Sequence, residues 1–394
     1  MKNPENSDSE AIDVVIFAPT SLGGLAEHVH YQAQELHNQG ASVVVLTSPD
    51  FLQGRVTGYC IKPVFPSLPV GGGLLNKARR LRALVQRYKI LNAWLQQHPC
   101  QILLLETYME YFSPLWAHFL SKIRRQGIFI GANLHDPVRD YRIGPQWMHD
   151  WSVKLAYRDL KFGFCHQHLP KSAGVPQHID IHTVPVGVYQ QSVEPLDQQD
   201  AKQGLGLPTD KRILLSFGFL RNNKNIDLVI RAMISSPDVF LIVAGRQQSA
   251  NDRPVSSYLE LASTCGVADR VRFDTDFIAD ESVPLYFSAC DLVLITYSSS
   301  FHSQSGVLNI AAAYRKPVLG SSGASPLRDA IIEYNLGIFV DPDNEAAIGT
   351  ALHVPTDPST CDWDGYSRYA SWKRNISPLM EMIGKPLTNP YDQV

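Results

Sequence analysis

The sequence lacks a long apolar stretch, a cluster of cysteines and an excess of charge of either sign. No run reaches the roughly 18 consecutive apolar residues that a membrane-spanning helix needs. The 35 basic and 38 acidic side chains give a net charge of -3, so binding to nucleic acid or another bulk polyanion is not expected. We therefore predict a protein that does not cross a membrane and has no nucleic-acid partner.

Cysteine usage and the first residues indicate a reducing compartment. The six cysteines are scattered, with no C-x-x-C pair, as is typical of cytosolic proteins. Residues 2–10 are polar and acidic with no apolar stretch behind them, so no secretory signal is predicted. We expect a cytoplasmic protein, with peripheral contact at the inner face of the cell membrane as an open alternative.

The chain is long enough for two hydrophobic cores. It has 394 residues, of which 44% are hydrophobic and 19% charged. Short apolar runs alternate with helical patterns in two series, the mark of parallel sheets covered on both faces. Strands are predicted at 12–17, 42–47, 102–105 and 128–131, then at 213–217, 239–243, 271–273, 292–295, 317–319 and 337–340. We predict an α/β fold of two doubly wound, Rossmann-like domains facing a central cleft.

The predicted domain boundaries follow the change in composition after residue 188. The segment 190–202 is rich in Gln, Asp and Pro, which is typical of a linker. We predict a disordered leader at 1–10, an N-terminal Rossmann-like domain at 11–188, a linker at 189–202, a C-terminal Rossmann-like domain at 203–362, and a C-terminal helix and tail at 363–394 that pack back toward the first domain. Ligands are expected at the carboxyl ends of the strands.

Two segments of the second series indicate a pocket for an anion. Arg221 and Lys224 place two cations after its first strand, where negative charge on a leaving group could be stabilised. Ser305, Gly306 and Val307 open an apolar helix, whose first N–H groups favour phosphate. A solvated turn and an ordinary helix start are the plainer interpretations of each segment alone.

The first series offers three candidate features at the ends of its strands. Gly23 and Gly24 would let the backbone approach a ligand, or simply make a turn; no G-x-G-x-x-G dinucleotide fingerprint is present. His135 could contact a sugar or a reacting centre, and a packed loop histidine is the alternative. Glu106 could hold a polar acceptor, or be an exposed loop acid.

No spacing of histidines or acids predicts a metal site. His28 and His30 lie two residues apart on a predicted helix, where side chains diverge. His166 and His168 could share one strand face but have no third ligand nearby in the sequence. Asp274-x-Asp276 ends a strand and is interpreted as a turn. We predict no metal and no cofactor.

A basic amphipathic helix is predicted within residues 74–95. Its basic positions are Lys77, Arg79, Arg80, Arg82, Arg87 and Lys89, and its apolar stripe is Ala78, Leu81, Leu84, Val85, Tyr88 and Leu91. Such a helix can lie on anionic lipid, and it can equally cover a core with a solvated basic face. Peripheral membrane contact through this helix is one of these two hypotheses.

These motifs resemble those of the family 4 glycosyltransferases, which have the two-domain GT-B fold, over nearly the whole chain. Residues 23–29 (GGLAEHV) resemble the family's Gly-Gly loop with its following His-Val, and residues 184–188 resemble its linker motif. Residues 217–232 are similar to its Gly-Arg-x-x-x-x-Lys loop and helix. Lys224 matches the lysine, whereas Phe219 stands at the arginine position and Arg221 is offset by two.

One family motif is replaced. Where members carry two glutamates eight positions apart, this chain has His302 and Ile310. It therefore looks like a divergent member that lacks the paired glutamates. The Ser-Gly-Val-Leu sequence at 305–308 is similar to a form, found in some relatives, that keeps the phosphate-binding amides.

The resemblance implies a hexosyltransferase that moves a sugar from a nucleoside-diphosphate donor to a glycan or lipid-linked acceptor, with retention, without metal, in polysaccharide biosynthesis. It implies that 11–188 is the acceptor domain and that 203–362 is the nucleotide-sugar domain. It implies catalytic roles for His135, Arg221 and Lys224, donor binding by Gly23, Gly24, Phe277, Ile278, Ser305, Gly306 and Val307, and acceptor binding by Glu106, Arg139 and Tyr141. The missing glutamates motivate an alternative, a non-catalytic GT-B subunit that binds or regulates a partner transferase.

Overall fold

The computed structural model divides the chain into two compact units. The N-terminal unit comprises Met1–Pro185 with Trp372–Val394, and the C-terminal unit comprises Val186–Ser371. The residues described are 11–19, 23–51, 56–67, 73–106, 112–135, 144–167, 169, 174–189, 196–247, 252–276, 278–385 and 387.

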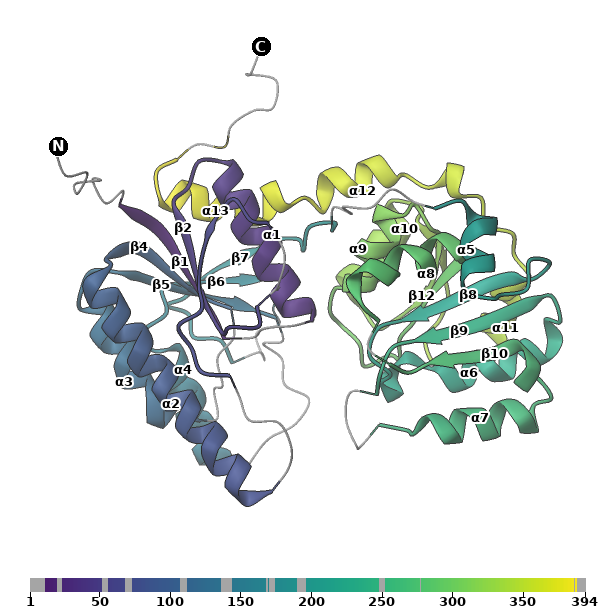
Figure 1. Ribbon diagram of the computed structural model, residues 1–394, viewed down its shortest axis with the longest axis horizontal. Coiled ribbons are helices and arrows are strands. Elements are labelled where there is room, and N and C mark those ends of the chain that lie inside the picture. Colours follow the sequence, from purple (N-terminus) through teal and green to yellow (C-terminus); the bar gives the residue numbers. More distant parts are fainter. Residues whose placement is uncertain are drawn as a thin grey trace, which may run out of the picture. The chain divides into compact units, whose positions relative to one another are not determined.

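Each unit is built on one parallel sheet (Figure 1). The N-terminal unit has seven strands in the order β3-β2-β1-β4-β5-β6-β7, with bounds β1 Ile12–Ala18, β2 Val43–Thr47, β3 Cys60–Lys62, β4 Cys100–Leu105, β5 Phe129–Leu134, β6 Phe162–Cys165 and β7 Asp180–Thr183. The C-terminal unit has six in the order β10-β9-β8-β11-β12-β13, with bounds β8 Arg212–Phe217, β9 Val239–Ala244, β10 Val271–Asp274, β11 Leu292–Thr296, β12 Val318–Ser321 and β13 Gly337–Phe339. The predicted fold class of two doubly wound α/β sheets is confirmed.

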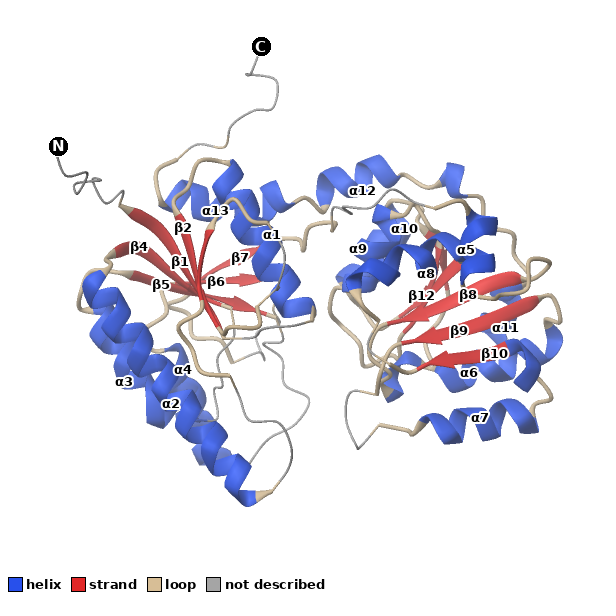
Figure 2. Cartoon of the chain, in the orientation of Figure 1, coloured by secondary structure: helices blue, strands red, loops and turns tan. Residues whose placement is uncertain are grey.

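The central strands are apolar on both faces because helices cover both. Val15 of β1 has no exposed surface, and it pairs in register with Val44 of β2 and Leu103 of β4. In Figure 2 the strands of each sheet lie between layers of helix. In the N-terminal unit one face packs against α2 (Leu74–Gln97), α3 (Ser113–Arg124) and α4 (Gln146–Tyr157), and the other against α1 (Gly24–Asn38) and α13 (Trp372–Met382).

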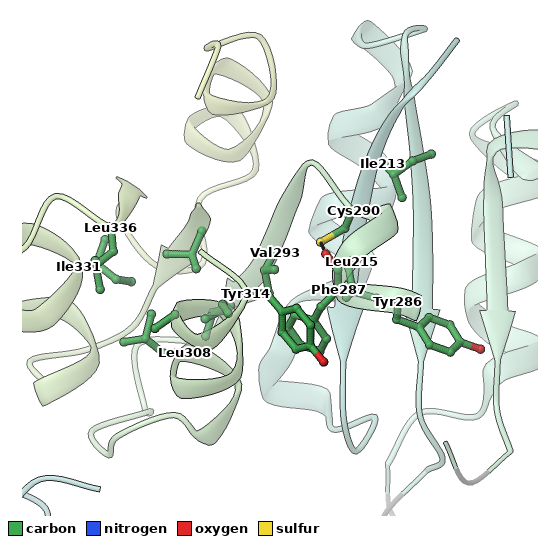
Figure 3. Close-up of a cluster of buried hydrophobic side chains, with 14 of the residues drawn as sticks. Ile213, Leu215, Tyr286, Phe287, Cys290, Val293, Leu308, Tyr314, Ile331 and Leu336 are labelled. Atoms are coloured by element: carbon green, nitrogen blue, oxygen red, sulfur yellow. Dashed lines mark hydrogen bonds between the residues drawn. The ribbon is translucent and has the colours of Figure 1, made fainter. Parts of the chain in front are cut away.

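The C-terminal unit follows the same plan. One face of its sheet packs against α5 (Gln198–Gly204), α8 (Val283–Ala289), α9 (Gly306–Ala313), α10 (Pro326–Glu333) and α12 (Trp363–Tyr369), and the other against α6 (Ile226–Ala232), α7 (Val255–Thr264) and α11 (Glu345–Leu352). Figure 3 draws part of the first core, where Ile213, Leu215 and Val293 of the strands gather with Phe287 and Tyr314. This core holds the start of α9 in place beside the strand ends.

The final helix differs from the prediction because it is broken. Instead of one helix near 363–380 there are two, α12 and α13, separated at Ala370, whose ψ of 57° is not helical. The unit boundary falls at this break, between Ser371 and Trp372. The predicted return of the C-terminus to the first domain is confirmed, since Gln32 of α1 donates to Asn375 of α13 at 2.8 Å. Residues 198–204 of the expected linker form helix α5.

Helix α2 covers the predicted 74–95 and ends two residues later, at Gln97, but its basic face is shorter than expected. Arg87 is only 6% exposed, and its guanidinium donates to the Pro66 carbonyl at 3.1 Å, so it does not belong to the solvated face. Ala78, expected on the apolar stripe, is exposed. The exposed basic face is therefore confined largely to the first half of the helix, because only the second half packs on the sheet. Within the described residues, no helix is both long and apolar enough to cross a membrane.

Candidate functional site

The loop after β8 brings Lys224 to the carboxyl end of the C-terminal sheet. Residues Asn222–Lys224 form one 3-10 turn, and the Lys224 ammonium donates a hydrogen bond back to the carbonyl of Phe217, the last residue of β8. Thr296 at the end of β11 donates from its hydroxyl to the Lys224 carbonyl at 2.9 Å. The loop is thus fixed to the ends of two neighbouring strands.

The surroundings of the Lys224 ammonium are poor in compensating charge. Burial lowers the pKa of Lys224 to about 7, and the neighbouring Arg221 guanidinium acts in the same direction. A lysine whose pKa lies near neutral pH is stabilised in its charged form when an anion binds beside it. The Lys224 ammonium is therefore suited to an anionic ligand.

Gly218 lies between the Lys224 side chain and the start of α9. Its φ of +85° is left-handed, and a Cβ on it would lie 3.7 Å from Lys224 Nζ and 3.9 Å from Val307 Cγ2. Two of the predicted residues, Lys224 and Val307, therefore border the same glycine. Gly245 supports the turn, since a Cβ there would meet the Gly218 carbonyl at 2.3 Å and its φ is +141°. Only glycine fits such a backbone-to-backbone approach.

The start of α9 supplies backbone donors beside this loop. Ser305 is the N-cap residue, but its side chain does not cap a backbone N–H. Its hydroxyl instead lies 3.3 Å from the hydroxyl of Tyr297, whose ring stacks on Phe301 at 3.9 Å. Gly306 follows with an open Cα face, where a Cβ would have Tyr189 as its nearest contact at 3.7 Å. Such a helix start favours a negative charge.

The other residues expected at the donor site lie in different environments. Ile278 is partly buried and packs against the hydrophobic core, and Phe277 lies outside the described residues. His302 is exposed, with its Nδ1 3.0 Å from the Ala324 carbonyl, and Ile310 packs against the core. Neither position carries an acid. Asp274, interpreted from the sequence as part of a turn, pairs with Arg272 at 2.7 Å and accepts from Tyr286 at 2.8 Å.

Two supporting residues were not singled out from the sequence. Asn225 precedes α6 in a left-handed conformation (φ 52°), and its amide donates to Asp343 at 2.9 Å. Asp343 accepts from the backbone and hydroxyl of Ser299 at 2.9 and 2.7 Å. These bonds join the loops after β8, β11 and β13. An Asn before a helical pattern is a recognisable signal, whereas the partner Asp343 lies 118 residues away.

The N-terminal unit gathers three predicted or considered residues into a second cluster. Glu106 follows β4 and is 1% exposed, and its Oε1 lies 2.8 Å from His135 Nε2 and 3.1 Å from His28 Nδ1. Asn133 donates to its other oxygen. Burial by itself raises the pKa of the Glu106 carboxyl, but His28 and His135 together hold it well below its usual range.

This environment changes the role open to Glu106. Both of its oxygens are engaged inside the unit, so an acceptor would have to displace His135 or Asn133 to reach it. The carboxylate is better suited to positioning than to acceptor contact. The other predicted acceptor residues, Arg139 and Tyr141, lie outside the described residues.

Gly23 and Gly24 begin α1 at an open surface. Gly23 has a left-handed φ of +82°, and a Cβ at either position would have no described atom within 4 Å. His28 and His30 diverge as predicted: His28 turns inward, and His30 lies 2.9 Å from the Tyr59 hydroxyl. His166 follows the last residue of β6, and His168 lies outside the described residues.

Known protein families and curated relatives match part of this chain. Residues 197–353 match the family described as glycosyl transferases group 1. A D-inositol 3-phosphate glycosyltransferase of Mycolicibacterium gilvum is 25% identical over 282 residues, which are 69% of this chain and 60% of that protein. Its namesake in Mycobacterium tuberculosis is 29% identical over 186 residues, which are 47% of this chain and 37% of that protein. The chain thus spans less than two thirds of these curated relatives.

Solved structures match over nearly the full length at low identity. Sucrose-phosphate synthase from Thermosynechococcus elongatus has a TM-score of 0.67 at 17% identity, covering 94% of this chain and 97% of that one. Anabaena HepE in complex with UDP has a TM-score of 0.67 at 16% identity, covering 95% and 98%. These likenesses establish the GT-B fold.

Proposed function

We propose that this chain, which has the GT-B fold and whose residues 197–353 match the group 1 glycosyl transferases, transfers a sugar from a nucleoside-diphosphate donor. The observation that carries the proposal is the placement of Lys224 beside Gly218 and Val307, with its pKa lowered to about 7. A half-buried ammonium that has no ion pair within the described residues, next to an uncapped helix start, suits a diphosphate.

In the proposed reaction the bond between the anomeric carbon and the donor phosphate breaks. The diphosphate leaves with the electron pair, and Lys224, Arg221 and the N–H groups of 306 and 307 stabilise its growing charge. An acceptor hydroxyl bonds to the same face of the sugar, which retains the configuration, and its proton passes to the departing phosphate oxygen. No metal is required at the diphosphate, because the two cations and the amides supply its compensation.

The N-terminal unit provides the acceptor side of the proposal. His135 contacts the donor sugar, held by its hydrogen bond to Glu106, and Gly23 and Gly24 leave room for a ligand backbone or ring. The acceptor binds near Arg139 and Tyr141. We propose a glycan or a lipid-linked saccharide as acceptor, in the biosynthesis of a polysaccharide or glycolipid.

The rival proposal is a non-catalytic subunit that binds a donor or a partner transferase. It is motivated by His302 and Ile310, which offer no carboxylate to a donor ribose. The enzyme is favoured because Lys224, Gly218 and the α9 start retain the elements that a leaving diphosphate needs. Turnover with any sugar nucleotide separates the two hypotheses.

Nucleoside diphosphates are expected to stabilise the protein against heat. We would screen UDP, GDP, ADP and TDP by thermal shift, with UDP as first candidate because HepE of the same fold was solved with it. A nucleotide at a hundred times its dissociation constant adds about 2.7 kcal/mol to the free energy of unfolding. The matching nucleosides are the control, since they lack the phosphates that Lys224 would hold. Equal shifts with nucleosides, or none with any diphosphate, would contradict diphosphate binding.

We also propose that the first half of α2 contacts anionic lipid. Lys77, Arg79, Arg80 and Arg82 are exposed there, and Leu75 beside them is 65% exposed. Replacing the three arginines by glutamate should abolish binding to phosphatidylglycerol vesicles in a flotation assay, with little binding to neutral vesicles by either protein. The double variant Arg231→Glu/Arg368→Glu, on exposed sites of the C-terminal unit, is the control. Unchanged flotation of the α2 variant would remove this proposal.

A further inference from the structure

The cluster around Glu106 has the composition of a metal site. His28 comes from α1, Glu106 from the end of β4 and His135 from the end of β5. One ligand atom from each lies within 4.8 Å of the other two, and both nitrogens are 2.8–3.1 Å from the same carboxylate oxygen. Ligand atoms about 2.0–2.2 Å from a tetrahedral zinc are separated by about 3.3 Å, which is close to the two nitrogen-to-oxygen distances; the separation of the two nitrogens would adjust on binding.

Hydrogen bonding explains only part of this arrangement. His135 Nε2 donates to Glu106 in good geometry, but His28 Nδ1, at 3.1 Å, does not meet hydrogen-bond geometry. Within the described part of the chain, neither ring nitrogen of His28 has a hydrogen-bond partner, although the residue is 2% exposed. A buried nitrogen without a partner is costly, and a metal ion would satisfy Nδ1.

Neighbouring residues hydrogen-bond to the candidate ligands and orient them, as is common around metal sites. Asn133 donates to the other Glu106 oxygen and also to Gln32 at 2.9 Å, which fixes the carboxylate. His166 is 7% exposed, with Nδ1 3.1 Å from the Val184 carbonyl and no partner within the described structure for Nε2. Its ring centroid is 5.3 Å from those of His28 and His135. It adds a further uncommitted nitrogen beside the site.

We propose that His28, Glu106 and His135 bind a divalent transition metal ion of the zinc type. Two imidazoles and one carboxylate suit zinc and cobalt, whereas magnesium prefers oxygen ligands. The 22% exposure of the His135 side chain gives the ion a route from solvent. In the metal-free protein His135 carries its proton on Nε2, where it faces Glu106; coordination at Nε2 places that proton on Nδ1. This departs from the sequence-based prediction of no metal.

The inference shares His135 and Glu106 with the proposed glycosyl transfer, but it is tested without that reaction. All three ligands belong to the N-terminal unit, whereas the proposed diphosphate site belongs to the C-terminal unit. Binding of an ion to this cluster can be measured without any donor or acceptor.

The test is stoichiometric binding of zinc to the full chain. After dialysis against a chelator and then buffer, calorimetric titration with zinc should give about one tight site per chain, and cobalt should give the visible spectrum of a nitrogen- and oxygen-bound ion. Glu106→Gln keeps the side-chain shape and removes the charge, and we expect it to weaken binding by at least about 100-fold. His135→Gln, at a partly exposed position, is a second variant should Glu106→Gln fail to fold.

His30→Gln is the matched control, because His30 lies on the same helix outside the cluster. All proteins carry Cys60→Ser, which removes an exposed thiol that could bind zinc by itself. Zinc should raise the melting temperature of the parent and of the His30 variant, but not of the two cluster variants. Absence of a tight site in the parent, or equal affinity in the parent and both cluster variants, would overturn the proposal.

Discussion

Replacing Lys224 by alanine is expected to lower the rate of sugar transfer by about 10- to 1,000-fold. The physical reason is the loss of a cation that is held at the end of β8 and strengthened by a poorly solvated environment. The rate would be measured as release of nucleoside diphosphate and as labelled product under saturating donor. The loss should fall mainly on kcat, because the charge it stabilises grows as the leaving group departs.

Two further variants separate charge from packing. Lys224→Met keeps most of the apolar stem and should be as slow as Lys224→Ala if the charge is what matters. Lys211→Ala removes an ammonium that donates to the Pro237 carbonyl, away from the proposed diphosphate site, and it should keep the parent rate. A Lys224→Ala enzyme as fast as the parent would contradict the catalytic role. A parent without turnover on any donor would favour the non-catalytic subunit.

Affinity for the nucleoside diphosphate is expected to fall by about tenfold per pH unit between about pH 7 and 9. In the free protein the pKa of Lys224 is about 7, so most of its ammonium has lost its proton above that pH. A bound diphosphate, fully ionised in this range, favours the charged form and raises this pKa again. Binding must then take up a proton, and each pH unit makes that proton ten times scarcer.

Calorimetric titration in buffers of different ionisation enthalpy would measure this proton directly. We expect uptake of close to one proton per nucleotide at pH 8 in the parent. Lys224→Met should take up none and should bind with weak, pH-independent affinity. A parent whose affinity is flat across this range, or a variant that keeps the parent's slope, would show that another group titrates and that Lys224 does not hold the diphosphate.

The sequence predicted the sheets well where strands are continuous apolar runs. The runs 12–17, 239–243 and 292–295 correspond to β1, β9 and β11 within one residue at each end, because strands covered on both faces must be apolar throughout. Helix α2 agrees with the predicted 74–95 to within two residues, because its apolar residues recur with a helical period over many turns. The pattern failed for α12 and α13, since the break at Ala370 carries no glycine or proline to mark it.

Local motifs likewise pointed to Lys224 and Gly306 in advance, since a loop after a strand and a helix start are each written in a few adjacent residues. The residues that contact them in the fold could not be predicted from such local motifs. Asn225 bonds to Asp343 across 118 positions, and His28 meets Glu106 and His135, each from a different element. Sequence spacing considered His28 only with His30, because they are neighbours in the chain.

The amino-acid order alone thus settled most of the segments that become strands and helices, because these depend on short-range periodicity and backbone preference. It missed the short strands β3, β6 and β7 and the break between α12 and α13. The folded chain decided that Glu106 is enclosed, that Arg87 is buried and that Lys224 is desolvated. Burial and charge pairing are properties of neighbours brought together by sheet order, and in a parallel sheet those neighbours lie far apart in sequence.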